Sequence, residues 1–180
     1  LAHVQFETIH PFLDGNGRLG RLLIALLLHH GRLLQEPLLY LSLYFKQHRP
    51  VYYELLDRVR THGDWEAWVD FFLEGVQQTA SGAVSTAQRL VTLFEQDRQR
   101  VQAAASGSAL RVLASLHRRP LSSLKHLAAG SGLSFPTAAK AVQALAKLGV
   151  VNELTGQRRN RVFGYSAYLA ILNEDGEALR

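Results

Sequence analysis

The sequence predicts a mainly α-helical protein built in two parts, and three observations lead to that prediction. Apolar residues recur at helical spacing along most of the 180-residue chain. Two β-prone runs separated by a polar turn occur near the carboxyl end, which predicts a small hairpin there. Positive charge is also concentrated there. Residues 1–108 carry ten Lys and Arg against eleven Asp and Glu, whereas residues 109–180 carry ten against four.

The composition narrows the classes of protein that fit. Hydrophobic residues make up 47% of the chain, which is enough for a buried core. Cysteine is absent, which excludes disulfides and thiolate metal sites and fits a reducing, cytoplasmic location. The longest apolar run, Leu22 to Leu28, is much shorter than the ~20 residues of a membrane-spanning helix, so no membrane partner is expected. Because the chain opens on Leu1 without a methionine, we expect a fragment that lacks an N-terminal part.

Prolines and glycines divide the first part of the chain into helices. Pro11 breaks the first helix, Gly31 ends the second, and Pro37 and Pro50 stand at natural first positions of the next two. The run Leu22 to Leu28 predicts that the second helix is central and buried on all sides. Helices are therefore expected over residues 1–9, 19–30, 37–49 and 51–61, from Trp65 onward, and over residues 77–105.

The last part of the chain has the pattern of three helices followed by a hairpin. Pro120 and Gly130 end the first two helices, and Ser134 is suited to cap the third, which Gly149 ends. The runs VVNEL and VFGYSAY then flank the polar turn TGQRRNR. We therefore divide the chain into a first domain over residues 1–76, a linking helix and hinge over 77–108, and a second domain over 109–180.

The stretch IHPFLDGNGRLGR, from Ile9 to Arg21, carries the pattern of an anion-binding turn. Gly15 and Gly17 can adopt positive φ, which lets consecutive backbone N–H groups converge at the start of the following helix. A helix N-terminus also has a dipole that favours negative charge. Arg18 and Arg21 stand one turn apart at the head of this helix, so both can reach the same bound anion.

Two more side chains of this stretch suit chemistry on a phosphate. Asp14 offers the hard oxygen ligand that Mg²⁺ prefers beside phosphates, and His10 can act as a base near neutral pH. Each residue taken singly has a plainer interpretation: a capping histidine, an Asp-Gly turn, or a solvated pair of arginines. The combination in one register favours a phosphate site.

The segment HPFLDGNGRLGR resembles the signature H-x-F-x-[D/E]-G-N-G-R-x-x-R of Fic (Fido) domain proteins at every position. RPVYYELLDRVRTHGDWEAWVDFFLEGV is similar to the later helices of the same domain. The resemblance covers about the first half of the chain, and it implies a Fic-type helical core. It also implies transfer of AMP from ATP to a Ser, Thr or Tyr hydroxyl of a protein target, with Mg²⁺.

The resemblance implies a role for each residue of the motif. His10 would take the proton of the attacking hydroxyl, and Asp14 would hold Mg²⁺ between the α- and β-phosphates. Phe12 would pack the loop into the core. The phosphate oxygens would be cradled by Gly15, Asn16 and Gly17, and the outer phosphates would be bound by Arg18 and Arg21. Tyr52 and Tyr53 stand where the family has aromatic residues near the adenine, so they either help to bind the base or pack in the core.

The segment SFPTAAKAVQALAKLGVVNELTGQRRNRVFGY is similar to winged helix-turn-helix domains. That resemblance implies a recognition helix with Lys140 and Gln143 and a basic wing with Arg158, Arg159 and Arg161. The helix is rich in alanine and offers few side chains for base edges, which favours protein docking or homodimerisation over DNA binding.

The leading hypothesis is thus a protein adenylyltransferase. The alternatives are a DNA-binding regulator whose Fic half senses a nucleotide, or transfer of phosphate, uridylyl or phosphocholine on the same fold.

Overall fold

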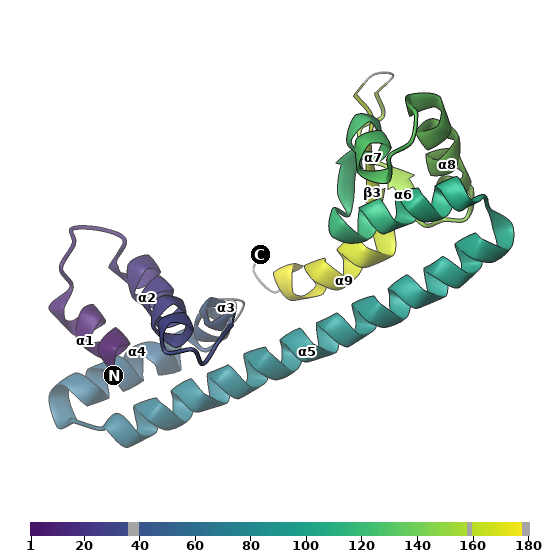
Figure 1. Cartoon of the computed structure of the whole chain (residues 1–180). Coiled ribbons are helices and arrows are strands. Elements are labelled where there is room, and N and C mark those ends of the chain that lie inside the picture. The colour runs from purple at the N-terminus through teal and green to yellow at the C-terminus, as the bar shows by residue number, and fades with distance from the viewer. Residues whose placement is uncertain (36–39, 158–159, 178–180) are drawn as a thin grey trace. The chain divides into compact units, whose positions relative to one another are not determined.

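The computed structural model describes residues 1–35, 40–157 and 160–177, and this part of the chain is mostly helical with three short strands (Figure 1). The predicted mainly α-helical class is confirmed. The chain forms two compact units, Leu1–Val84 and Ser85–Arg180, and each has its own hydrophobic core. Among the residues described, no helix is both long and apolar enough to cross a membrane.

The longest helix, α5, runs without interruption from Trp65 to Ala104 (Figure 1). The helices expected separately from Trp65 and over residues 77–105 are therefore one element. Gly75 lies inside this helix, and the ring of Tyr44 packs directly against it. A Cβ atom at this glycine would lie only 2.6 Å from Tyr44 Cδ1. The boundary between the two units falls inside this helix, after Val84.

Among the described residues of the first unit, four helices precede α5, and a core of packed aromatic rings holds them together. The ring centroids of Phe45 and Tyr52 lie 5.0 Å apart, and those of Phe45 and Phe71 lie 5.9 Å apart. Pro50 stands in the first turn of its helix, as predicted, whereas Pro37 lies outside the described residues. The four helices are α1 (Ala2–Ile9), α2 (Asn16–His30), α3 (Leu41–Gln47) and α4 (Arg49–His62).

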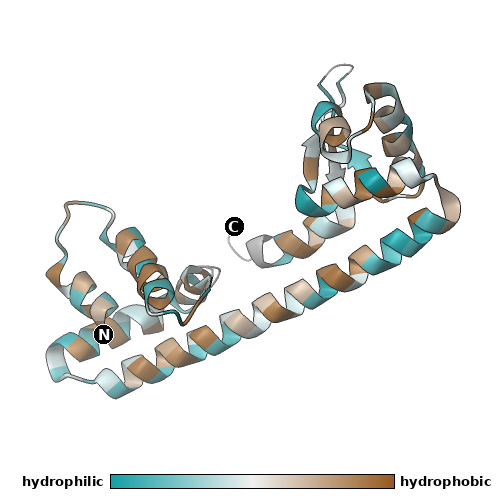
Figure 2. Ribbon diagram, in the orientation of Figure 1, coloured by the Kyte–Doolittle hydropathy of each residue, from teal (hydrophilic) through white to brown (hydrophobic). Residues whose placement is uncertain are grey.

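The prediction that the second helix is buried on all sides is wrong. Helix α2 is strongly apolar (Figure 2), but only Asn16, Gly20 and Ile24 are buried on it. Leu22 and Leu26 are each 53% exposed. The three buried positions are four residues apart, so they form one narrow stripe, which packs against α1. Apolar composition alone does not decide how many neighbours a helix has.

In its described residues, the second unit combines the end of α5 and four further helices with a three-stranded antiparallel sheet of order β1-β3-β2. Leu121 pairs with Gly164, and Val151 pairs with Tyr165, so β3 lies in the middle. The hairpin of β2 and β3 was predicted, whereas β1 and the last helix were not. The elements are α6 (Gly107–Arg118), β1 (Leu121–Ser123), α7 (Leu124–Ser131), α8 (Phe135–Lys147), β2 (Val151–Glu153), β3 (Val162–Tyr165) and α9 (Ser166–Glu177).

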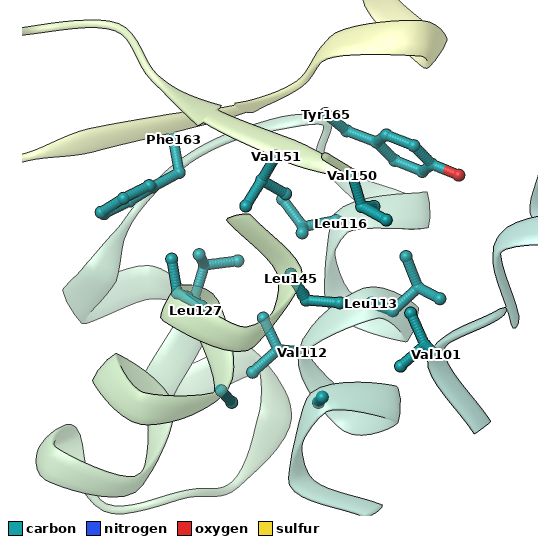
Figure 3. Packing of buried hydrophobic residues seen from close by; sticks show 13 residues of the cluster. Val101, Val112, Leu113, Leu116, Leu127, Leu145, Val150, Val151, Phe163 and Tyr165 are labelled. Atoms are coloured by element: carbon teal, nitrogen blue, oxygen red, sulfur yellow. The ribbon is translucent and has the colours of Figure 1, made fainter. Parts of the chain in front are cut away.

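Aliphatic side chains fill the core of the second unit, as Figure 3 shows. Leu113 and Leu116 from α6, Leu145 from α8 and Val151 from β2 are almost completely buried, and Val101 joins them from the end of α5. This contribution from α5 places the last turns of the long helix inside the second unit.

The buried carboxylate of Asp97, on α5, makes polar contacts with other elements of the second unit. Asp97 accepts a 2.8 Å hydrogen bond from the Tyr165 hydroxyl and forms a 2.6 Å ion pair with Arg100. Arg100 in turn donates to the Leu148 carbonyl oxygen at 2.8 Å. Burial and the hydrogen bond to Asp97 raise the pKa of Tyr165, so its hydroxyl is a donor at neutral pH. The interactions join α5, the end of α8 and β3.

We expect Asp97→Ala to lower the free energy of unfolding of the second unit by about 2–4 kcal/mol, because it leaves the Tyr165 hydroxyl buried without an acceptor. Urea unfolding followed by circular dichroism measures the loss. Tryptophan fluorescence serves as an internal reference, since Trp65 and Trp68 both lie in the first unit. Glu95→Ala, at an exposed position two residues away, is the matched control. An equal effect of both variants would contradict the anchoring role of Asp97.

Candidate functional site

Two residues of positive φ, His10 and Gly15, shape the backbone of the Ile9–Arg21 stretch. His10 follows the last residue of α1 with φ 50°, and its N–H donates to the Phe6 carbonyl oxygen at 3.0 Å. Gly15 precedes α2 with φ 84°. Positive φ is costly for a histidine and free for a glycine, so the strain of this loop is concentrated at His10. The loop therefore reverses the chain between α1 and α2 and leaves His10 exposed at its entrance.

A buried asparagine holds this loop closed. Asn16 is only 2% exposed, and both ends of its carboxamide bond the backbone of Phe12. The Phe12 N–H donates to Asn16 Oδ1 at 3.0 Å, and Asn16 Nδ2 donates to the Phe12 carbonyl oxygen at 2.6 Å. The side chain of Asn16 is thus occupied within the loop. Only its backbone N–H, in the first turn of α2, is placed to contribute to a phosphate cradle.

Phe12 itself does not anchor the loop, and the prediction that it packs in the core is wrong. Its side chain is 51% exposed, and its ring lies 6.3 Å from that of Phe6, centroid to centroid. The backbone of Phe12 is the part that is fixed. Sequence reasoning missed this because an aromatic residue suggests core packing, and the sequence does not show that Asn16 bonds the backbone of Phe12.

The N-terminus of α2 is open toward an anion. The first N–H groups of any helix have no acceptor within it, and no side chain caps this helix. Asp14 Oδ1 accepts from the N–H of Gly15, at 2.7 Å, and leaves the N–H groups of Asn16, Gly17 and Arg18 as the first helical donors. These donors and the helix dipole together favour a phosphate at this point.

The two arginines of α2 have different surroundings. Arg18 is exposed and forms an ion pair with Asp14 Oδ2 at 3.3 Å. Arg21 is partly buried and folds back toward the helix start, where its Nη1 lies 3.2 Å from the Cβ position of Gly17. Both cations therefore stand at the end of α2 that carries the free N–H groups. An exposed pair such as Asp14–Arg18 contributes at most about 1 kcal/mol, so a ligand can replace it.

The residues near Asp14 fit one particular kind of metal site. In the part of the chain that the structure describes, no cluster of three His, Cys, Asp or Glu side chains is present. A metal held by protein ligands alone is therefore not supported there. Mg²⁺ commonly takes one or two carboxylates and completes its shell with water and substrate phosphates. Asp14, exposed beside the free N–H groups of α2, suits this second arrangement.

Tyr52 and Tyr53 lie in unlike environments. Tyr52 is buried, its hydroxyl lies 2.9 Å from His3 Nε2, and burial raises its pKa. Tyr53 is exposed, and the Arg49 guanidinium lies 5.6 Å from the centre of its ring. Of the two, Tyr53 is available to a ligand from solvent, whereas Tyr52 belongs to the aromatic core.

The candidate contact residues of the second unit also differ in their surroundings. Lys140 and Gln143 lie exposed on α8. Arg161 is engaged, because it forms an ion pair with Glu153 at 2.5 Å and lies over the Phe163 ring. Arg158 and Arg159 fall outside the described residues.

Comparison with known proteins points to the same stretch. Residues 1–28, which contain the whole loop, match the Fic/DOC family. The chain is 38% identical over 79 residues to the protein adenylyltransferase Fic of Aedes aegypti and 39% identical to that of Culex quinquefasciatus. Each match covers 44% of this chain and 14% of the relative. The beginning of the chain is thus similar to the Fic/DOC family, and the longer similarity is to adenylyltransferases.

The buried His3 gives the first unit a specific pH dependence. Burial lowers the pKa of His3 from 6.5 to about 4, so the folded protein keeps the ring neutral where the unfolded chain binds a proton. The free energy of unfolding should therefore fall as pH drops from 6.5 to 4, by about 2 kcal/mol from this group. We expect His3→Gln to remove that part of the dependence in urea titrations at several pH values. The exposed control His30→Gln should keep the dependence, and an unchanged profile in His3→Gln would contradict the assignment.

Proposed function

We propose that the first unit belongs to a protein adenylyltransferase of the Fic type, which moves AMP from ATP to a Ser, Thr or Tyr hydroxyl of a protein. The observation that carries the proposal is the open N-terminus of α2, with Asp14, Arg18 and Arg21 gathered at the same end. The similarity of this stretch to the Fic/DOC family and to named adenylyltransferases supports it.

In this proposal the N–H groups of Asn16, Gly17 and Arg18 bind phosphate oxygens of ATP. Arg21 is already folded toward these groups, and Arg18 joins it when phosphate takes the place of Asp14. Asp14 is then free to hold Mg²⁺, which supplies positive charge where negative charge develops on the phosphates. The rigid loop fixes these groups in advance, and such preorganisation lowers the barrier to transfer.

His10 has the base role. The hydroxyl oxygen of the target attacks the α-phosphorus and forms a new P–O bond, while the hydroxyl proton passes to the imidazole. The bond between the α-phosphorus and the bridging oxygen breaks, and its electron pair leaves with pyrophosphate. His10 suits this role because it stands exposed at the loop entrance, where a protein chain can reach it. Tyr53, exposed on α4, is proposed as the tyrosine that contacts the base of the nucleotide.

His10→Ala tests the proposal directly. We expect transfer of label from α-³²P-ATP to proteins of a cell lysate to fall by about 10²-fold or more, the usual size of a lost general base, while the affinity for Mg-ATP changes little. Autoradiography measures transfer, and calorimetry measures binding. His30→Ala, at an exposed histidine of the same unit, is the control. Equal labelling by His10→Ala would remove the base role, and labelling from γ-³²P-ATP instead would indicate phosphate transfer.

For the second unit we propose a winged helix-turn-helix type of module over residues 109–180 that docks to protein, including a second copy of the chain. The order of α6, α7 and α8 with the β2–β3 hairpin supports this arrangement. The ion pair of Arg161 with Glu153 favours protein docking over DNA, because it removes one cation from the basic turn.

We expect no duplex DNA binding tighter than about 10⁻⁴ M at physiological salt, the weak end of non-specific binding. Fluorescence anisotropy with a labelled duplex measures this, and light scattering on the same sample measures self-association. If a duplex instead binds with steep salt dependence and Lys140→Ala weakens it, the DNA alternative replaces protein docking.

A further inference from the structure

Helix α5 carries an exposed apolar stripe that belongs to neither hydrophobic core. Three of its side chains are large and well exposed: Leu73 at 55%, Val84 at 56% and Val91 at 68%. Ala80 and Ala87, which are also exposed, stand between them. We call these five residues the α5 seam. Successive members are three, four or seven residues apart, so all five lie on one face of the helix.

The seam lies on a different face of α5 from the contacts that the helix makes within each unit. In the first unit, α5 buries Phe71, which stands two residues before Leu73 and therefore points another way. In the second unit, α5 buries Asp97, six residues after Val91 and about 240° further round the helix. A regular stripe of exposed apolar side chains marks an interaction surface, so the seam is open to another molecule.

The two ends of the seam carry opposite charges. Glu66 stands seven residues before Leu73, and Arg98 stands seven residues after Val91, so both continue the same face of α5. Both side chains are exposed. Neither forms an ion pair in the part of the chain that the structure describes. The face is therefore apolar along its middle, acidic at one end and basic at the other.

The apolar positions match those of a second α5 helix that runs in the opposite direction. With a twofold axis level with Gly82, Leu73 lies opposite Val91 of the second copy, and Ala80 lies opposite Val84. The small side chains near the axis let two helices approach closely, since the distance between packed helices depends on the side chains at the contact. The seam is thus complementary to itself under twofold symmetry.

The charges select this direction and this register. The same twofold axis sets Glu66 opposite Arg98 of the second copy, and symmetry makes this pairing occur twice. A parallel arrangement in register would set Glu66 beside Glu66 and Arg98 beside Arg98, and like charges between neighbouring helices are unfavourable. One antiparallel register therefore satisfies the apolar and the charged positions together.

We propose that α5 pairs through its seam with the α5 helix of a second copy of the chain, in the antiparallel direction. The seam is about 27 Å long, so the interface is small, and we expect a dissociation constant in the micromolar range. This surface differs from the docking surface proposed for residues 109–180. The pairing also does not depend on the proposed transfer of AMP.

Val84→Glu tests whether the seam is the interface. We expect it to raise the dissociation constant of the dimer by about tenfold or more, because it brings two carboxylates into the apolar contact near the axis. Sedimentation velocity over a series of concentrations measures association, and circular dichroism checks that the helix content is kept. Ser85→Glu, which adds the same charge at the next, also exposed, position, is the matched control and should have little effect. Equal effects of the two variants, or a chain that stays monomeric throughout the series, would overturn the proposal.

Charge reversal tests the direction of the helices without a change in the seam itself. Glu66→Arg and Arg98→Glu, each made alone, should raise the dissociation constant by about threefold to tenfold, because each sets like charges together twice in the antiparallel pair. The double variant should recover the original affinity. A parallel pair already has like charges together, so neither single change would weaken it. Failure of the double variant to recover would overturn the proposal.

A distance measurement gives the direction independently. The chain has no cysteine, so Asp70→Cys allows a single spin label to be placed at an exposed site on α5. In the antiparallel pair Asp70 stands level with Phe94 of the second copy, so the two labels lie about 36 Å apart along the helix axis. Electron paramagnetic resonance measures this separation, and labels that lie side by side would overturn the proposal.

One further variant distinguishes this proposal from docking through the second unit. Lys140→Glu changes an exposed residue of α8 and leaves α5 unchanged, so it should not alter the seam dimer. If the dimer is lost in Lys140→Glu and kept in Val84→Glu, the second copy docks through the second unit. That outcome would overturn pairing through α5 and would support the docking role proposed for residues 109–180.

Discussion

The carboxamide of Asn16, bonded at both ends to the backbone of Phe12, is the interaction on which the loop depends. It satisfies the backbone N–H and carbonyl oxygen of Phe12 within the loop that precedes α2, and it does so from a buried position. Because the fastening comes from inside the loop, the outward side of the α2 N-terminus keeps its N–H groups for a ligand. A side-chain cap at the usual position would have used one of these donors.

Burial divides the charged groups around this loop into two kinds. Asp14 and Arg18 are exposed, pair with each other and can exchange that pairing for a ligand at little cost. Arg21 and Glu7 are partly buried, and the positive charge of Arg21 affects the pKa of both His3 and Tyr52. The arginines stand only three residues apart on one helix. Arg18 can therefore exchange Asp14 for a ligand, whereas Arg21 lies deeper and is folded toward the start of the helix.

Much of this could be predicted from the sequence, because the signals are local. The helical class, the β2–β3 hairpin and the helix start at Pro50 follow from periodicity and from residues with restricted backbones. The candidate site could be located for the same reason: its residues are contiguous, and the Gly15 conformation is a property of the residue itself. The continuity of α5 was missed because the sequence becomes polar and rich in alanine from residue 77, although the helix continues through this change.

The sequence by itself therefore determined which residues form the loop, what chemistry they suit and which segments are helical. Only the tertiary structure decided that Leu22 and Leu26 are exposed, that Phe12 is fixed by its backbone and not by its ring, and that Glu7 lies against Gly20. These depend on contacts between α1, α2 and α4, which no periodicity along one helix encodes. The backbone preferences of a residue are intrinsic, but its burial is set by whatever element packs against it.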